Sequence, residues 1–166
     1  PRGSGRGVNT EGPAQVLPWG KGEVLRDGPL EGPLLLPVGP LVYDALEAAE
    51  ELASRGIEVT VIDPRFIKPL DEELLLPRLR RTTLAVTVEE NALAGGFGSA
   101  ILEFCSEHQI MTPVRRLGIP DSFLSHGSQA RLRGSCGLDA DGIVTLVESA
   151  LSNAATALAI PASAHS

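Results

Sequence analysis

The chain has 166 residues, of which 43% are hydrophobic and 21% charged, so it holds enough apolar material for one folded domain. Its formal net charge of -7 argues against a nucleic-acid-binding protein, because such proteins neutralise phosphates with basic side chains. No apolar stretch reaches the roughly 20 residues that a membrane-spanning helix needs. We therefore expect a globular domain that binds neither nucleic acid nor membrane.

The first 22 residues are rich in Gly and Pro and show little periodicity, which indicates a linker or extended arm over residues 1–22. This segment contains no initiator Met and no signal-peptide pattern. We therefore expect the chain to begin within a longer protein.

Alternating regular elements are predicted after the arm. Short apolar or alternating runs bounded by turn residues predict strands over residues 22–28, 34–38, 57–62, 84–88 and 114–119. Helical spacing of apolar residues predicts helices over residues 41–55, 71–80, 129–133 and 139–151, with a further helix that opens at Gly95–Gly98. Asp71 is expected to cap its helix, and Pro77 to interrupt or kink the same helix.

This alternation of strands and helices is typical of an α/β fold, a three-layer sandwich with a mostly parallel sheet. Right-handed crossovers would place helices on both faces of the sheet. We assign residues 23–151 to this domain and residues 152–166 to an Ala-rich tail that we expect to fray.

Cys105 and Cys136 form no CxxC motif and have no pair of histidines at ligand spacing, which argues against a zinc site. A disulfide between the two is the alternative to two free thiols. We expect the free thiols of a cytosolic protein.

The Gly-rich turn Gly95–Ser99 lies between a predicted strand and a predicted helix, where backbone N–H groups can bind phosphate. The dinucleotide fingerprint fails, because its third glycine would fall on Ile101, and no Walker lysine follows. We favour a tight turn that lets the helix pack closely on the sheet, and phosphate binding stays open as the alternative.

Glu89 and Glu90 end the strand before this turn, at the sheet edge where open α/β sheets usually place ligands. Adjacent strand residues point to opposite faces, so the two carboxylates are not expected to act as one acid–base pair. We expect one glutamate near a helix N-terminus and the other at an interface, with catalysis as the less favoured reading.

His126 lies in a loop with Asp121 and Ser125 nearby, which invites a catalytic-triad interpretation. There is no GxSxG elbow and no evident oxyanion loop, so we favour a loop or interface histidine.

Arg2 and Arg6 lie in the Gly-rich arm, and arginine suits bidentate phosphate recognition.

Four segments together resemble the C-terminal domain of the transketolase superfamily of thiamine-diphosphate enzymes. They are Gly20–Gly28, Val42–Ala49, Ile62–Asp71, and Val86–Asn91 followed by Gly95–Gly98. The β subunits of 2-oxo-acid dehydrogenases share this domain. Four further segments are similar to one synthase branch of the superfamily: Pro1–Gly3, Arg65–Asp71, Leu117–Phe123 with His126-Gly127, and Gly137–Ile143.

The resemblance implies an enzyme that condenses pyruvate with glyceraldehyde 3-phosphate and releases carbon dioxide, for isoprenoid, thiamine and pyridoxal synthesis. It implies thiamine diphosphate and Mg²⁺, bound mainly by preceding domains, and a cytoplasmic or plastid homodimer. Arg2 matches a Pro-Arg-Gly motif and is implied to bind the substrate phosphate. No catalytic, cofactor-binding or metal-binding residue is carried over to this chain.

The resemblance further implies that residues 1–22 include the end of the preceding pyrimidine-binding domain. The C-terminal domain would support dimerisation and close the substrate side of the site, and alone it would be inactive. Gly39-Pro40 departs from the Gly-Thr that usually follows the first strand, and Pro37 and Pro77 are also unusual. Two alternatives remain, the β subunit of a 2-oxo-acid dehydrogenase and a non-catalytic, stand-alone binding module.

Overall fold

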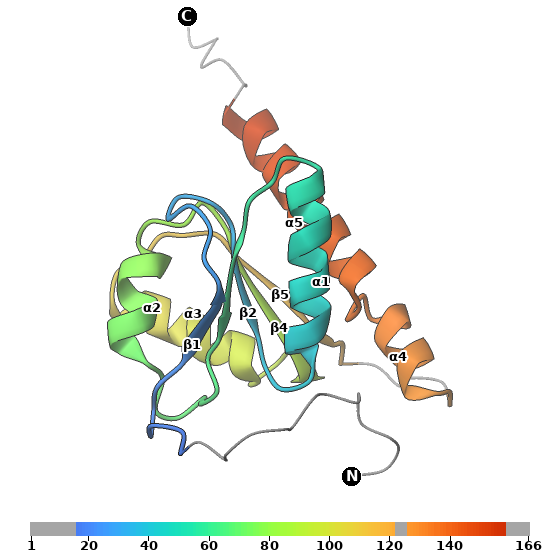
Figure 1. Cartoon of the computed structure of the whole chain (residues 1–166), viewed down its shortest axis with the longest axis horizontal. Coiled ribbons are helices and arrows are strands. Elements are labelled where there is room, and N and C mark those ends of the chain that lie inside the picture. Colours follow the sequence, from blue (N-terminus) through green and yellow to red (C-terminus); the bar gives the residue numbers. More distant parts are fainter. Residues whose placement is uncertain (1–15, 122–125, 159–166) are drawn as a thin grey trace, which may run out of the picture.

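The computed structural model describes residues 16–121 and 126–158, with side chains described through residue 153. Five strands and five helices lie along these residues, and they alternate from β2 to α4 (Figure 1). The strands are β1 (Glu23–Arg26), β2 (Leu34–Pro37), β3 (Thr60–Asp63), β4 (Ala85–Ala92) and β5 (Val114–Ile119). The helices are α1 (Leu41–Ser54), α2 (Glu72–Leu79), α3 (Phe97–Glu107), α4 (Gln129–Ser135) and α5 (Ala140–Leu158).

The strands form one sheet in the order β1-β3-β2-β4-β5. The pairs β3–β2, β2–β4 and β4–β5 are parallel, and only β1 runs antiparallel, along the outer edge of β3. Helices α1 and α5 cover one face, and α2 and α3 cover the other (Figure 1). The predicted α/β sandwich with a mostly parallel sheet is therefore confirmed.

The alternation of side chains along β2 explains why both faces are covered. Leu35 packs in the cluster beneath α1 and α5, whereas Leu34 and Leu36 pack in the cluster beneath α2 and α3. All three leucines are buried, which is the pattern of a central strand in a parallel sheet. Removing this apolar surface from water on both faces supplies the main drive for folding.

Several element boundaries differ from the sequence-based expectation. Strand β3 begins at Thr60 instead of Ile57, and β4 continues past Val88 to Ala92. Helix α2 continues through Pro77 to Leu79, so of the expected interruption or kink the interruption is wrong, and the kink stays a prediction. The last helix runs to Leu158 instead of ending at Leu151, because its Ala-rich sequence contains no helix breaker there. The first part of the expected frayed tail is thus helical.

No helix within the described parts of the chain is long and apolar enough to cross a membrane.

Candidate functional site

The carboxyl ends of the parallel strands meet at one edge of the sheet, and the loops that follow them gather there (Figure 1). This edge carries the loop after β3, the turn between β4 and α3, and helix α4 (Figure 1). Ligands of open α/β sheets bind at such an edge.

Glu89 lies at this edge and is directed at the start of α3. Its carboxylate accepts hydrogen bonds from the backbone N–H of Phe97 at 2.7 Å and of Gly98 at 2.8 Å. The residue is only 2% exposed. A helix N-terminus leaves its first N–H groups without partners inside the helix, and a carboxylate satisfies them well. The expectation of one glutamate at a helix N-terminus is confirmed for Glu89.

The same contacts decide the role of the Gly-rich turn. Two of its N–H groups already bind an internal carboxylate, which removes them from phosphate binding. A Cβ atom at Gly96 would lie 2.3 Å from Glu89 Oε2 and 2.4 Å from the carbonyl oxygen of Ala92, so only glycine fits. The tight-turn interpretation is confirmed.

Arg116 of β5 supports this turn from the neighbouring strand. Its Nη1 atom donates to the carbonyl oxygen of Leu93 at 2.7 Å and to Ser99 Oγ at 3.1 Å. The aliphatic stem of Arg116 also packs against Gly98, where a Cβ atom would lie 2.7 Å from Arg116 Cδ. Sequence reasoning missed this residue, because nothing local marks a β5 arginine as the partner of a turn 17 residues earlier.

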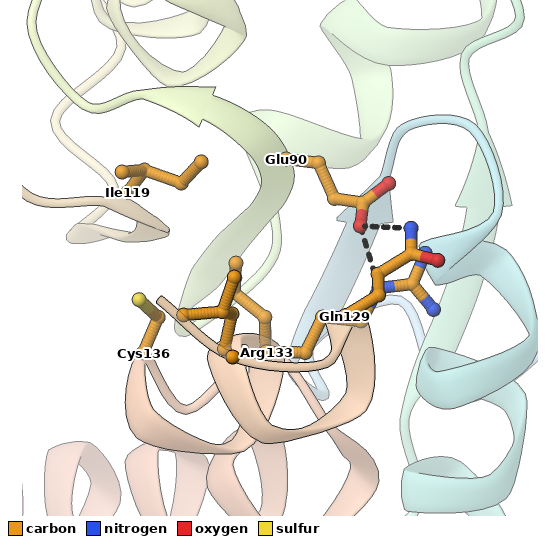
Figure 2. A pocket seen from close by; sticks show the side chains of 8 residues that line it. Glu90, Ile119, Gln129, Arg133 and Cys136 are labelled. Carbon is orange, nitrogen blue, oxygen red and sulfur yellow. Dashed lines mark hydrogen bonds and ion pairs between the residues drawn. The ribbon is translucent and has the colours of Figure 1, made fainter. Parts of the chain in front are cut away.

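Glu90 points away from Glu89 into a cavity of about 680 Å³ between the ends of β4 and β5 and helix α4. Arg133 Nε donates to Glu90 Oε1 at 2.5 Å, and Gln129 Nε2 donates to the same oxygen at 3.3 Å (Figure 2). The remaining lining residues are Ile119, Gly127, Leu132, Cys136 and Leu138. Figure 2 shows Ile119 and Cys136 apart from this ion pair.

The ion pair favours the ionised form of the Glu90 carboxylate. Hydrogen bonding to Arg133 lowers the pKa of Glu90 below its usual range, and the same contact raises the pKa of Arg133. A carboxylate held in its ionised form this way is a poor proton donor at neutral pH. The two glutamates therefore serve different elements, as their opposite directions predicted, and they do not form a shared acid–base pair.

His126 and Asp121 are exposed, whereas Ser125, the third residue of the suggested triad, lies outside the described residues. Within the described part of the chain, the side chains of His126 and Asp121 form no hydrogen bond to each other. Arg2 and Arg6 also lie outside the described residues, so the phosphate-binding role of Arg2 stays a prediction.

The two cysteines are free thiols, as expected. Cys105 is buried, and burial raises the pKa of its thiol, which makes it less reactive. Cys136 is half-buried at the cavity wall.

The described residues offer no site for the diphosphate and metal ion, which the resemblance assigns mainly to preceding domains. Among them, no group of three or more His, Cys, Asp or Glu side chains is arranged to hold a metal ion. The two glutamates near the carboxyl edge are instead engaged by the chain itself, Glu89 by α3 and Glu90 by α4. No step of cofactor chemistry is derived from these side chains.

Comparison with known proteins agrees with this arrangement. The family model for the C-terminal domain of transketolase matches residues 20–143. The chain belongs to this family, the C-terminal domain of transketolase.

The similar proteins carry a more specific name. The chain is 49% identical over 148 residues to 1-deoxy-D-xylulose-5-phosphate synthase 1 of Geobacter metallireducens, covering 89% of this chain and 23% of that protein. It is 44% identical over 147 residues to 1-deoxy-D-xylulose-5-phosphate synthase of Syntrophotalea carbinolica, again covering 89% and 23%. The chain thus spans about a quarter of the length of these relatives.

A solved structure described as a split-gene transketolase, inactive β4 tetramer, has the same fold. It superposes with a TM-score of 0.74 at 36% identity, covering 82% of this chain and 44% of that one.

Proposed function

We propose that this chain is the C-terminal part of a 1-deoxy-D-xylulose-5-phosphate synthase. Such a synthase is a transferase that joins pyruvate to glyceraldehyde 3-phosphate with loss of carbon dioxide, at the start of isoprenoid synthesis. The observation that carries the proposal is the 44–49% identity to proteins of that name across 89% of the chain. Arg65–Asp71, one of the segments that resemble the synthase branch, lies inside the family-model match over residues 20–143.

In this proposal the domain has a structural role in the enzyme and supplies no catalytic residue. Its best-placed carboxylates are used internally, and its described residues offer no metal-binding group. Thiamine diphosphate and Mg²⁺ belong to preceding parts of the longer protein in this proposal. Arg2, in the segment before the domain, is the residue that would bind the phosphate of glyceraldehyde 3-phosphate by paired hydrogen bonds.

The longer protein acts as a homodimer in a cytoplasmic or plastid location. The related split-gene chain forms a tetramer, which supports self-association of this type of domain. The two free thiols agree with a reducing compartment. Gel filtration and cell fractionation of the full-length protein test these two points.

The activity test compares the isolated chain with the full-length protein. Both are assayed with pyruvate and glyceraldehyde 3-phosphate in the presence of thiamine diphosphate and Mg²⁺, and carbon dioxide release is measured. We expect turnover by the full-length protein alone, as the inactive related tetramer supports. The proposal would be overturned by turnover by the isolated chain, or by no turnover of these two substrates by the full-length protein.

A further inference from the structure

The segment that leads into the domain is held by the loop between β3 and α2. Asp71 Oδ2 accepts a hydrogen bond from the backbone N–H of Gly22 at 3.1 Å, and Asp71 Oδ1 lies 3.3 Å from Lys21 Nζ. Asp71 is only 6% exposed, and its Oδ1 also accepts from the N–H of Leu74 at 3.3 Å to cap α2. One buried carboxylate therefore joins the entering chain to a helix of the domain.

Further contacts hold the same segment along the same loop. Gly20 has a positive φ of 68°, and a Cβ atom there would lie 2.9 Å from Pro69 Cγ. The side chains of Glu23 and Arg65 form an ion pair. These contacts fix the direction in which the chain enters the domain, which a single surface hydrogen bond could not do.

The contacts leave a group of apolar side chains exposed. We define the entry patch as the exposed residues Leu17, Trp19 and Ile67 together with the half-buried Phe66. Trp19 is 76% exposed and meets Phe66 edge to face, with ring centroids 5.2 Å apart, while Ile67 is 40% exposed. An exposed tryptophan of the entering segment beside an exposed isoleucine of the loop is typical of an interaction surface.

We propose that the entry patch is the surface on which the folded domain preceding residue 1 in the longer protein packs. This inference rests on the proposed function, because that function places such a domain there. The entering segment, Leu17 to Gly22, is itself part of the patch or adjoins it, so whatever precedes the segment is tethered beside this surface.

The small size of the patch favours a tethered domain over a second copy of the chain. Stable association of separate proteins buries about 1,200–2,000 Å² in total, more than four side chains provide. A covalent tether supplies a high effective concentration, so a smaller surface is enough to hold a neighbouring domain. The patch therefore fits an intramolecular contact.

Oxidative footprinting of the unmodified full-length protein tests whether the patch is covered. Met111 is the matched control, since it is 91% exposed and precedes β5 at the opposite edge of the sheet. The ratio of Trp19 to Met111 oxidation is measured in the folded protein and in urea. Burial of Trp19 should lower this ratio about fivefold or more on folding, because interface cores pack as densely as protein interiors. An unchanged ratio would overturn the proposal.

Photo-crosslinking identifies what covers the patch. p-Benzoylphenylalanine replaces Ile67 in the full-length protein, and replaces Met111 in the control. We expect crosslinks from position 67 to peptides that precede residue 1, and none of these from position 111. Crosslinks from position 67 confined to residues 1–15 or to a second copy would refute the assignment. Activity of the unmodified protein is measured separately, so a covered patch in a protein without synthase activity would overturn only the proposed function.

Discussion

Glu89 Oε2 accepts a hydrogen bond from the backbone N–H of Phe97 at 2.7 Å, which joins β4 to the first turn of α3. The carboxylate thereby occupies the position at a helix N-terminus where an α/β protein could have bound an external anion. The Glu89 carboxylate already occupies the anion position at the N-terminus of α3, so the turn needs no external anion.

The first prediction concerns this contact. Glu89→Gln should lower the free energy of unfolding by about 1–3 kcal/mol, because the amide NH₂ group cannot accept a hydrogen bond and leaves one buried N–H group without a partner. Urea denaturation measures the change. Glu107→Gln is the control, since Glu107 is exposed near the other end of α3. Equal stability of the two variants would contradict the capping role of Glu89.

The second prediction concerns the space around Gly96. Gly96→Ala should destabilise the protein by about 1–3 kcal/mol, because the new methyl group overlaps Glu89 Oε2 and the Ala92 carbonyl oxygen and forces a shift of the turn. Thermal unfolding measures this effect. Gly127→Ala is the matched control, because its Cβ atom would meet only ordinary contacts, the nearest at 3.6 Å. A harmless Gly96→Ala substitution would show that the turn has room to relax.

Local patterns predicted much of this structure because they arise from short-range physics. The helical spacing of Leu41, Ala45, Ala48 and Leu52 gave the correct α1, and the opposite directions of Glu89 and Glu90 followed from strand geometry alone. The side chain of Asp71 caps α2, as its position before two glutamates predicted. Each of these features depends on residues close together in the chain.

Features that join distant segments could not be predicted in the same way. Arg133 forms a hydrogen bond with Glu90, which lies 43 residues earlier in the sequence, and Asp71 accepts one from Gly22, which lies 49 residues earlier. Such partners depend on the strand order, in which β1 adds antiparallel to β3, and no periodicity in the sequence encodes that order. The Glu90 cavity and the entry patch were missed for this reason.

The third prediction is a pH dependence of the α4 contact. Arg133 lowers the pKa of Glu90, so this pair stabilises the folded state above the ordinary pKa of glutamate, about 4.3. The stabilisation is lost as the pH falls below that value and Glu90 becomes protonated in the folded state. We expect the stability difference between the unsubstituted protein and Glu90→Gln to shrink between about pH 6 and pH 3.

Urea denaturation at several pH values measures this difference, and Glu103→Gln, which alters an exposed carboxylate of α3, is the control. The Glu103→Gln curve should follow that of the unsubstituted protein. A difference for Glu90→Gln that stays constant over the whole range would mean that Arg133 does not favour the ionised form.

The last prediction tests Arg2 in the full-length enzyme and depends on the proposed function. Arg2→Ala should raise the KM for glyceraldehyde 3-phosphate far more than the KM for pyruvate, since only the former substrate carries a phosphate. Loss of a charged hydrogen-bonding partner costs about 1.5–3 kcal/mol, which corresponds to roughly a 10- to 150-fold change in kcat/KM for that substrate.

Two matched variants separate phosphate binding from a general effect on the segment. Arg6→Ala removes an arginine from the same Gly-rich stretch and should leave both KM values nearly unchanged. Arg2→Lys keeps the charge but loses the paired hydrogen-bond geometry, so its KM for glyceraldehyde 3-phosphate should lie between those of the unsubstituted enzyme and Arg2→Ala. Equal increases for both substrates in Arg2→Ala would exclude the phosphate role, because a disturbed segment would then explain the loss without any contact to phosphate.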